Sequence, residues 1–382
     1  MRIAQVTYST KPRGGVVHTL ALSEALARRG HDVTVWTLGR GGDDAFFRPV
    51  DESVGIHVVP FETRDGESVG DRIERSIETM RAAFDEAGRA EPFDVVHAQD
   101  CISANAVGPC IRTIHHLDEF TTPRLIACHD SAVREPIARL CVSDAVAQDV
   151  RSGWVLQPTV IPNGVDATRF AQAAGPGGED ARAEWRGRLG EYVLALGGIE
   201  PRKGSIDLLE AFALLRRSRP GLRLVFGGGE TLFDYRPYRE AFDARIVELA
   251  VEPIVLGVVD DAALPALVAA ASVLAFVSTK EGFGLAAMEA LAAGVPVVAR
   301  DLPVLREVFG EAVAYASGPS SIAACLEAAV DGIGPAAAVG RELAASHNWD
   351  DVARLHEAFY ASVGKEGDHG EAVDLPDLHL AR

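Results

Sequence analysis

The sequence predicts an α/β protein made of two domains of similar design. Short apolar runs of strand type alternate with helical segments in both halves of the chain, which is the pattern of parallel sheets covered by helices. In each half the first strand runs into a glycine-containing loop that leads to a helix. At 382 residues the chain is too long for one ordinary core and has the length of two such domains.

Composition narrows the classes of partner. The chain carries 37 basic and 55 acidic side chains, and its net charge of −18 opposes general binding to nucleic acid or to an anionic membrane. A small basic site and peripheral membrane contact remain compatible with this charge. The five cysteines (Cys101, Cys110, Cys128, Cys141 and Cys325) are odd in number and form no Cys-x-x-Cys pair, so we expect reduced, mostly buried thiols.

The first residues have the pattern of a strand rather than of a targeting segment. Residues 3–7 alternate as a strand does, and the longest apolar stretch, residues 262–277, is shorter than a membrane span and contains Pro265 and Ser272. We therefore expect a cytoplasmic protein without a transmembrane segment.

A glycine pair precedes the first predicted helix, which covers residues 16–29. Gly14 and Gly15 would let the backbone turn tightly and approach a ligand, and the helix would offer its positive end to an anion. Such a pair before a helix is more often a simple turn. Its spacing does not match Gly-x-Gly-x-x-Gly, which argues against a dinucleotide-dependent oxidoreductase.

The first half continues with alternating elements. We predict strands at 32–37, 56–60, 94–97, 112–116 and 140–142, and helices at 71–87 and from Ser143, as N-cap, to 151. In the fourth of these strands Thr113 and His115 share a face, and His115 stands at the carboxyl end, where open α/β sheets bind ligands. His115 is thus a candidate site residue, although a structural histidine and the neighbouring His116 are alternatives.

The second half repeats the plan after a linker predicted for residues 171–190. Strands are expected at 192–196, 222–226 and 273–277, and helices at 205–215, 262–271 (capped by Asp260 or Asp261), 319–331, 335–346 and 349–363. Lys203 lies beside Arg202 and Gly204 where the first loop joins its helix, and it could meet phosphate oxygens as a compact cation.

The most informative stretch is 281–301, which combines a loop, a helix starting near Gly284 and a strand. Glu281 would lie just before the helix and Glu289 two turns inside it, so both carboxylates could reach one cleft. The free backbone N–H groups of Phe283, Gly284 and Leu285 suit a diphosphate. An Ala-rich core helix with a solvated acid is the competing interpretation.

The block Glu-Gly-Phe-Gly-Leu-x3-Glu-Ala-x-Ala-x-Gly-x-Pro-Val-Val-Ala, together with residues 161–166 and the surroundings of Lys203, resembles the retaining glycosyltransferases of the GT-B fold, family 4 type (glycosyl transferases group 1). The resemblance extends over residues 1–363. It implies two Rossmann-like domains facing each other across a cleft, an acceptor domain (1–164 with 349–363) and a nucleotide-sugar donor domain (165–348). It also implies that the last helix crosses back to the first domain and that a polar tail follows at 364–382.

The resemblance also assigns roles to residues. Glu281 would contact the donor sugar, Glu289 would hold the ribose, and His115 would lie beside the sugar. Lys203 matches the lysine of a family pattern Gly-Arg-x4-Lys-Gly, whereas Gly198 replaces its diphosphate-binding arginine, for which Arg202 is the available substitute. We therefore take His115 and Glu281 as catalytic candidates. The substrate-binding candidates are Gly14, Gly15, Arg202, Lys203, Phe283, Gly284, Leu285 and Glu289.

These assignments imply a retaining hexosyltransferase that moves a sugar from a nucleoside diphosphate to an acceptor hydroxyl, with the nucleotide sugar as co-substrate and no metal or other cofactor. An epimerase or phosphorylase of the same fold is an alternative. A non-catalytic nucleotide-sugar binding protein is another, and the glycine at position 198 favours it. The sequence does not identify the base, the sugar, the acceptor or the oligomeric state.

Overall fold

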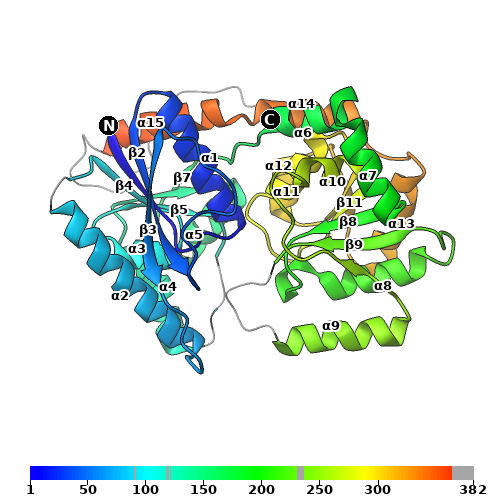
Figure 1. Ribbon diagram of the computed structural model, residues 1–382, viewed down its shortest axis with the longest axis horizontal. Coiled ribbons are helices and arrows are strands. Elements are labelled where there is room, and N and C mark those ends of the chain that lie inside the picture. Colours follow the sequence, from blue (N-terminus) through cyan, green and yellow to red (C-terminus); the bar gives the residue numbers. More distant parts are fainter. Residues whose placement is uncertain (90–91, 118–119, 121, 230–235, 364–382) are drawn as a thin grey trace. The chain divides into compact units, whose positions relative to one another are not determined.

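The structure is a computed structural model that describes residues 1–89, 92–117, 120, 122–229 and 236–363. The chain divides into two compact units, here called unit 1 (residues 1–164 and 349–363) and unit 2 (residues 165–348). The tail predicted for 364–382 lies outside the described residues. Each unit consists of a parallel sheet with helices on both faces (Figure 1).

Unit 1 contains a seven-stranded parallel sheet in the order β3-β2-β1-β4-β5-β6-β7. Its strands are β1 (Arg2–Val6), β2 (Asp32–Arg40), β3 (Val54–Phe61), β4 (Val95–Ala98), β5 (Ile111–Ile114), β6 (Ala138–Cys141) and β7 (Thr159–Val160). Its helices are α1 (Gly14–Arg28), α2 (Val69–Gly88), α3 (Cys101–Ala106), α4 (Pro123–Arg134), α5 (Asp144–Trp154) and α15 (Trp349–Val363).

Unit 2 contains a six-stranded parallel sheet in the order β10-β9-β8-β11-β12-β13. Its strands are β8 (Tyr192–Leu196), β9 (Arg223–Gly227), β10 (Ile254–Val255), β11 (Val273–Phe276), β12 (Val297–Arg300) and β13 (Ala314–Ala316). Its helices are α6 (Ala167–Ala174), α7 (Glu179–Leu189), α8 (Ser205–Leu215), α9 (Arg236–Leu249), α10 (Leu264–Ala270), α11 (Leu285–Ala292), α12 (Pro303–Phe309), α13 (Pro319–Val330) and α14 (Ala337–Ser346).

The two sheets share one topology. If the strands of unit 2 are renumbered from β8, both orders begin 3-2-1-4-5-6, the doubly wound Rossmann order. The order reverses between β1 and β4 in unit 1 and between β8 and β11 in unit 2. Ligands of such sheets bind at the carboxyl ends of the strands that flank this switch point, and the predicted α/β class with two Rossmann-like sheets is thereby confirmed.

The helix predicted for residues 349–363 is also found. Trp349, Val352, Leu355 and Phe359 of α15 are buried, and α15 packs against α1 within unit 1 (Figure 1). Ser143 caps α5 as predicted, accepting the Val146 N–H at 3.3 Å. Across the described residues, none of the helices is both long and apolar enough to span a membrane.

The linker predicted for residues 171–190 is wrong. The segment forms the end of α6, a short 3-10 turn and the helix α7. Phe170 and Leu189 anchor it in the core, and the buried Arg182 donates to the carbonyl of Gly175 at 2.8 Å. A few buried contacts therefore order a stretch whose composition alone is typical of a linker.

Two helix starts also differ from expectation. α1 begins at Gly14, so Gly14 and Gly15 form its first turn instead of a preceding loop. α10 begins at Leu264 with Ala263 at the N-cap, and the Asp260 carboxylate instead accepts the Ala262 N–H in the preceding turn at 2.8 Å. In both places the propensity of the residues misplaces a helix end by about one turn or less.

Candidate active site

The switch point of unit 2 brings together two predicted site loops. One follows β8 and contains Gly197, Gly198 and Lys203, and the other follows β11 and contains Ser278 and Glu281. The strands are neighbours in the sheet, with Leu274 of β11 opposite Leu194 of β8. A small cavity between the two loops is lined by residues of both. Residues that are about eighty positions apart in the sequence thus meet at one strand edge.

Lys203 and Glu281 form the centre of this site. The Lys203 Nζ donates to Glu281 Oε1 at 2.6 Å, and the two side chains are 19% and 11% exposed. Burial alone would favour the neutral carboxyl, but the charges of Lys203 and then Arg202 outweigh it and lower the pKa of Glu281 to about 2. Glu281 is therefore ionised throughout the physiological range.

Arg202 completes a cluster of four charges. Its guanidinium contacts Glu281 Oε1 at 3.2 Å and Glu200 Oε1 at 3.0 Å. With Lys203, the cluster holds two positive and two negative side chains. The structure thus places the predicted substitute for the arginine missing at Gly198 beside Lys203, where two carboxylates already engage it.

Glycines make this loop conformation attainable. Gly204 has φ +65°, and a Cβ there would lie 2.4 Å from the carbonyl oxygen of Val277. Gly197 has φ +129°, and a Cβ there would lie 3.0 Å from Cε of Lys203. The absence of side chains at both positions lets the loop close over β11 and lets the Lys203 stem run along it, with Nζ 5.6 Å from the Phe276 ring centroid.

The third part of the site is the start of α11. Gly284 precedes the helix with φ +110°, and a Cβ there would lie 2.8 Å from the Phe309 ring. Among the described residues, the N–H groups of Phe283, Gly284 and Leu285 donate to no other group, whereas Ala287 and Met288 donate to the Gly284 carbonyl. The first turn of α11 therefore keeps the free N–H groups that the sequence predicts for a diphosphate.

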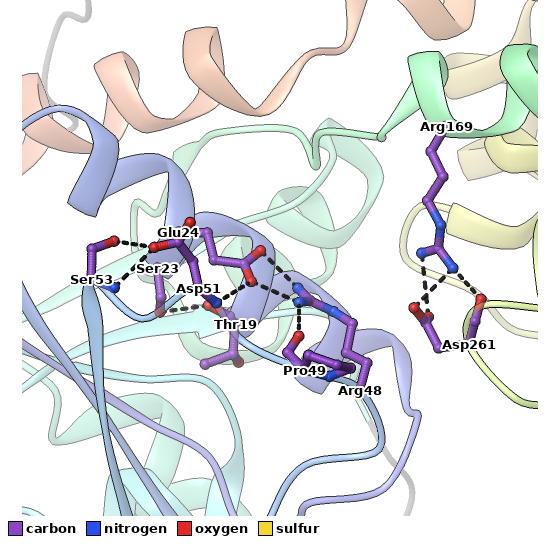
Figure 2. Close-up of polar contacts among 9 residues, drawn as sticks. All are labelled: Thr19, Ser23, Glu24, Arg48, Pro49, Asp51, Ser53, Arg169 and Asp261. Carbon is purple, nitrogen blue, oxygen red and sulfur yellow. Dashed lines mark hydrogen bonds and ion pairs between the residues drawn. The ribbon is translucent and has the colours of Figure 1, made fainter.

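Glu289, one and a half turns inside α11, has a different environment from Glu281. Burial, opposed by Arg169 and reinforced by Asp261 and Asp166, raises the pKa of Glu289 to about 8. Arg169 does not neutralise it, because its guanidinium is directed at Asp261, with Nη2 2.8 Å from Oδ2 (Figure 2). The carboxyl of Glu289 is mainly protonated at pH 7 and can both donate and accept hydrogen bonds.

In unit 1, His115 lies directly after β5 and points toward α1. Its Nε2 is 3.2 Å from Gln99 Oε1, and a Cβ on Gly15 would lie 3.4 Å from its Cδ2. Burial, then the nearby His116, Arg112 and His356, lower the pKa of His115 to about 3, so the ring is neutral at pH 7. The structure thus brings His115 and Gly15 together.

Three further histidines, which the sequence analysis missed, surround His115. His18 lies on α1 with its ring 4.8 Å from that of His115, and its Nδ1 is 2.8 Å from Asn163 Oδ1. His97 and His356 are also buried, and His97 Nδ1 is 2.8 Å from the Tyr360 hydroxyl. The only signal for His18 is its place on the apolar face of α1, one turn after Gly14 and Gly15.

The helix that carries His18 is held by polar contacts. Arg48 reaches Glu24 of α1 with two nitrogens, at 2.7 and 2.8 Å (Figure 2). Within α1, Thr19 donates to the Gly15 carbonyl at 2.6 Å. The Arg48 and Glu24 side chains are 16% and 18% exposed, so this bidentate pair is largely shielded from water. It fixes α1, and with it the first turn that contacts His115.

Comparison with known proteins now adds the family. Residues 12–169 match the model of "Glycosyltransferase Family 4" and residues 183–331 that of "Glycosyl transferases group 1". The chain belongs to this family of glycosyltransferases and has its α/β GT-B fold.

Relatives with different named activities are similar to this chain. The chain is 29% identical to a glycogen synthase of Mycobacterium tuberculosis, over all of this chain and 99% of the relative, and 30% identical to a phosphatidyl-myo-inositol mannosyltransferase of that species, over 81% and 80%. Among solved structures, Anabaena HepE in complex with UDP-glucose superposes with a TM-score of 0.74 at 19% identity, covering 95% of this chain and 100% of that one. The last likeness supports the fold alone.

Proposed function

We propose that this glycosyltransferase moves a hexosyl group from a nucleoside diphosphate sugar to an acceptor hydroxyl, with retention of the anomeric configuration. The observation that carries the proposal is the pairing of Lys203 with Glu281 at the switch point of unit 2, beside the free N–H groups of α11. The activities named for two relatives, a glycogen synthase and a mannosyltransferase, support a sugar donor, and a similar solved structure contains UDP-glucose.

In this proposal the charges of unit 2 serve the departing diphosphate. Lys203 and the N–H groups of Phe283, Gly284 and Leu285 donate hydrogen bonds to the diphosphate and stabilise its developing negative charge without a metal ion. The diphosphate competes with Glu281 for Lys203, which leaves the Glu281 carboxylate to face positive charge that develops on the sugar ring. Arg202 adds a second cation in place of the arginine absent at Gly198. We further propose that unit 1 binds the acceptor and that the enzyme acts in the cytoplasm.

Glu289 has a separate role in the proposal. As a carboxyl group that can donate and accept, it holds the ribose hydroxyls in the ground state and in the transition state alike. His115, in unit 1, is proposed to lie beside the donor sugar as a neutral ring. Its contact with Gly15 and Gln99 favours it over His116 for this role.

The first test is a thermal-shift panel of nucleoside diphosphates and nucleotide sugars. A true ligand at a hundredfold excess over Kd stabilises the folded state by about 2.7 kcal/mol. Lys203→Ala should abolish the shift, and Lys11→Ala, on an exposed lysine of unit 1, serves as the matched control. Wild-type nucleotide affinity in Lys203→Ala would reject the phosphate site.

Steady-state kinetics with varied donor then separate the two glutamates. Glu289→Gln should mainly raise the donor KM, by about 0.5–1.5 kcal/mol in binding because the Glu289 carboxyl is mainly neutral at pH 7, while Glu281→Gln should mainly lower kcat. The anomeric signal of the product, followed by NMR, tests retention, and release of an isomerised sugar instead of transfer would point to an epimerase. His115→Ala should reduce turnover more than His116→Ala; equal losses would remove the preference for His115.

A further inference from the structure

Two cysteines of unit 1 lie in contact. Cys101 is the first residue of α3 and Cys128 lies in α4, and their Sγ atoms are 3.7 Å apart. Both residues are half-buried and both thiols are free. The pair lies just after β4, close to the switch point of the unit 1 sheet. The expectation of mostly buried thiols is therefore wrong, because Cys325 is half-buried as well and only Cys110 and Cys141 are buried.

An amide holds the two sulfurs together. The Asn105 Nδ2 donates to the carbonyl oxygens of Cys101 and Cys128, both at 2.8 Å, and lies 3.2 Å from the Cys128 Sγ. Because α3 also packs against α4, the sulfur contact is fixed by the backbone of both helices rather than by one mobile side chain. Little movement is needed to bring the sulfurs to bonding distance.

The two thiols differ in acidity. The contact between the two thiols, in which either sulfur can donate, and the charge of Arg112 lower the pKa of Cys128, whereas the same contact and burial raise the pKa of Cys101. Arg112 is only 3% exposed, and its Nε and Nη1 have no hydrogen-bond partner among the described residues. A buried cation without a full set of partners favours a thiolate nearby.

The other cysteines lack this combination. Burial raises the pKa of Cys110 to about 11 and that of Cys141 to about 12, and it also raises the pKa of Cys325, whose Sγ contacts the Tyr315 carbonyl. All three are poor nucleophiles at neutral pH. Cys325 is half-buried like the pair, and it is therefore a matched control.

We propose that Cys101 and Cys128 form a redox-sensitive site that hydrogen peroxide converts to an intramolecular disulfide. The Cys128 thiolate attacks one peroxide oxygen, the O–O bond breaks, and the hydroxide that leaves takes up a proton to give water and a sulfenic acid. The Cys101 sulfur then gives up its proton and attacks the Cys128 sulfur, so that the S–S bond forms and a second water leaves. The two thiols lose two electrons and the peroxide gains them.

The test is peroxide titration of the full-length chain, followed by alkylation and peptide mass mapping. We expect a linked Cys101–Cys128 peptide, reversal by dithiothreitol, and measurably faster oxidation of Cys128 than of Cys325, because the pKa of Cys128 is lowered and that of Cys325 is raised, which favours the thiolate at Cys128. The disulfide should raise the Tm by a few degrees, since it closes a loop in the unfolded chain.

Two variants assign the order of the steps. Cys101→Ser should stop the reaction at a sulfenic acid on Cys128, which dimedone traps, whereas Cys128→Ser should abolish rapid oxidation and Cys325→Ser should change nothing. Equal oxidation of Cys128 and Cys325, a disulfide between chains, or no linked peptide would overturn the proposal. The wild-type mapping decides this even if a variant folds poorly, and no outcome depends on the proposed sugar transfer.

Discussion

Replacing Glu281 by glutamine removes the charge on which Lys203 and Arg202 converge, and it should destabilise unit 2. A lowering of the Glu281 pKa from 4.5 to about 2 corresponds to roughly 3 kcal/mol of extra stabilisation of the ionised carboxylate in the folded state. The glutamine resembles the protonated acid in charge. Because Arg202 keeps its contact with Glu200, we expect a loss of about 2–3 kcal/mol at pH 7.

This loss has a defined pH dependence. The folded pKa lies below the unfolded one, so the stabilisation is fully present above about pH 4.5 and disappears as the pH falls toward 2. The difference in stability between the wild type and Glu281→Gln should therefore be constant near neutrality and begin to close below about pH 4.5.

Hydrogen exchange followed by mass spectrometry measures this change within unit 2 alone. Peptides covering β8 and β11 should exchange up to about a hundredfold faster in Glu281→Gln than in the wild type, since each 1.4 kcal/mol is about tenfold. Glu248→Gln is the matched control, because the Glu248 side chain is largely in solvent and its partner Arg245 keeps its contact with Glu210, so this variant should change nothing. If Glu281→Gln exchanged at the wild-type rate, the cost of burying the Glu281 carboxylate would already cancel its attraction to Lys203 and Arg202.

Three further predictions concern stability. Gly204→Ala should lower the stability of unit 2 by roughly 2 kcal/mol or more, because Gly204 has a positive φ and a Cβ there would clash with the carbonyl of Val277. Gly187→Ala, in open space on α7, should instead raise the stability by up to about 1 kcal/mol. Thermal unfolding should show Tm shifts of opposite direction for the two variants, and equal shifts would contradict the prediction. Acid should destabilise unit 1, because burial lowers the pKa of His356 to about 4, whereas the same ring in the unfolded chain takes up a proton near pH 6.5. Urea unfolding should therefore show the stability falling from about pH 6.5 to 4. A stability that does not change over this pH range would refute the prediction. Glu289 should make stability change with pH in the opposite direction, since its folded pKa of about 8 lies above the unfolded value. The stability of unit 2 should fall as the pH rises from about 4.5 to 8. Glu289→Gln should remove this pH dependence.

The elements that the sequence predicts well are those whose pattern is local. The apolar runs of the parallel strands and the spacing of Trp349, Val352 and Phe359 reflect burial of the residue itself, so periodicity finds them. The segment 171–190 failed because its large buried apolar residues, Phe170 and Leu189, lie at its edges, and the buried side chain between them is the charged Arg182. Composition could not show that these few residues suffice to order it.

The candidate site also has some features that a local pattern predicts and others that depend on contacts between distant parts of the chain. The free N–H groups at Gly284 follow from a helix start that the chain itself marks. The contact between Lys203 and Glu281 depends on β8 lying beside β11, a long-range pairing that neither loop encodes. The burial of His18 against His115 likewise needs the position of α1 on the sheet, and a single histidine in an apolar helix gives no sign of it.

The chain enters and leaves unit 2 at adjacent points, and this affects how the protein is made. The Val165 N–H donates to the His347 carbonyl at 2.6 Å, and Gly164 packs against the Trp349 ring, so that unit 2 is an insertion within unit 1. During synthesis at about 5–20 residues per second, roughly 10–40 s separate Gly164 from α15. Throughout that interval the face of α1 that α15 will cover stays open to solvent, and every residue of unit 2 has been synthesised before unit 1 can close.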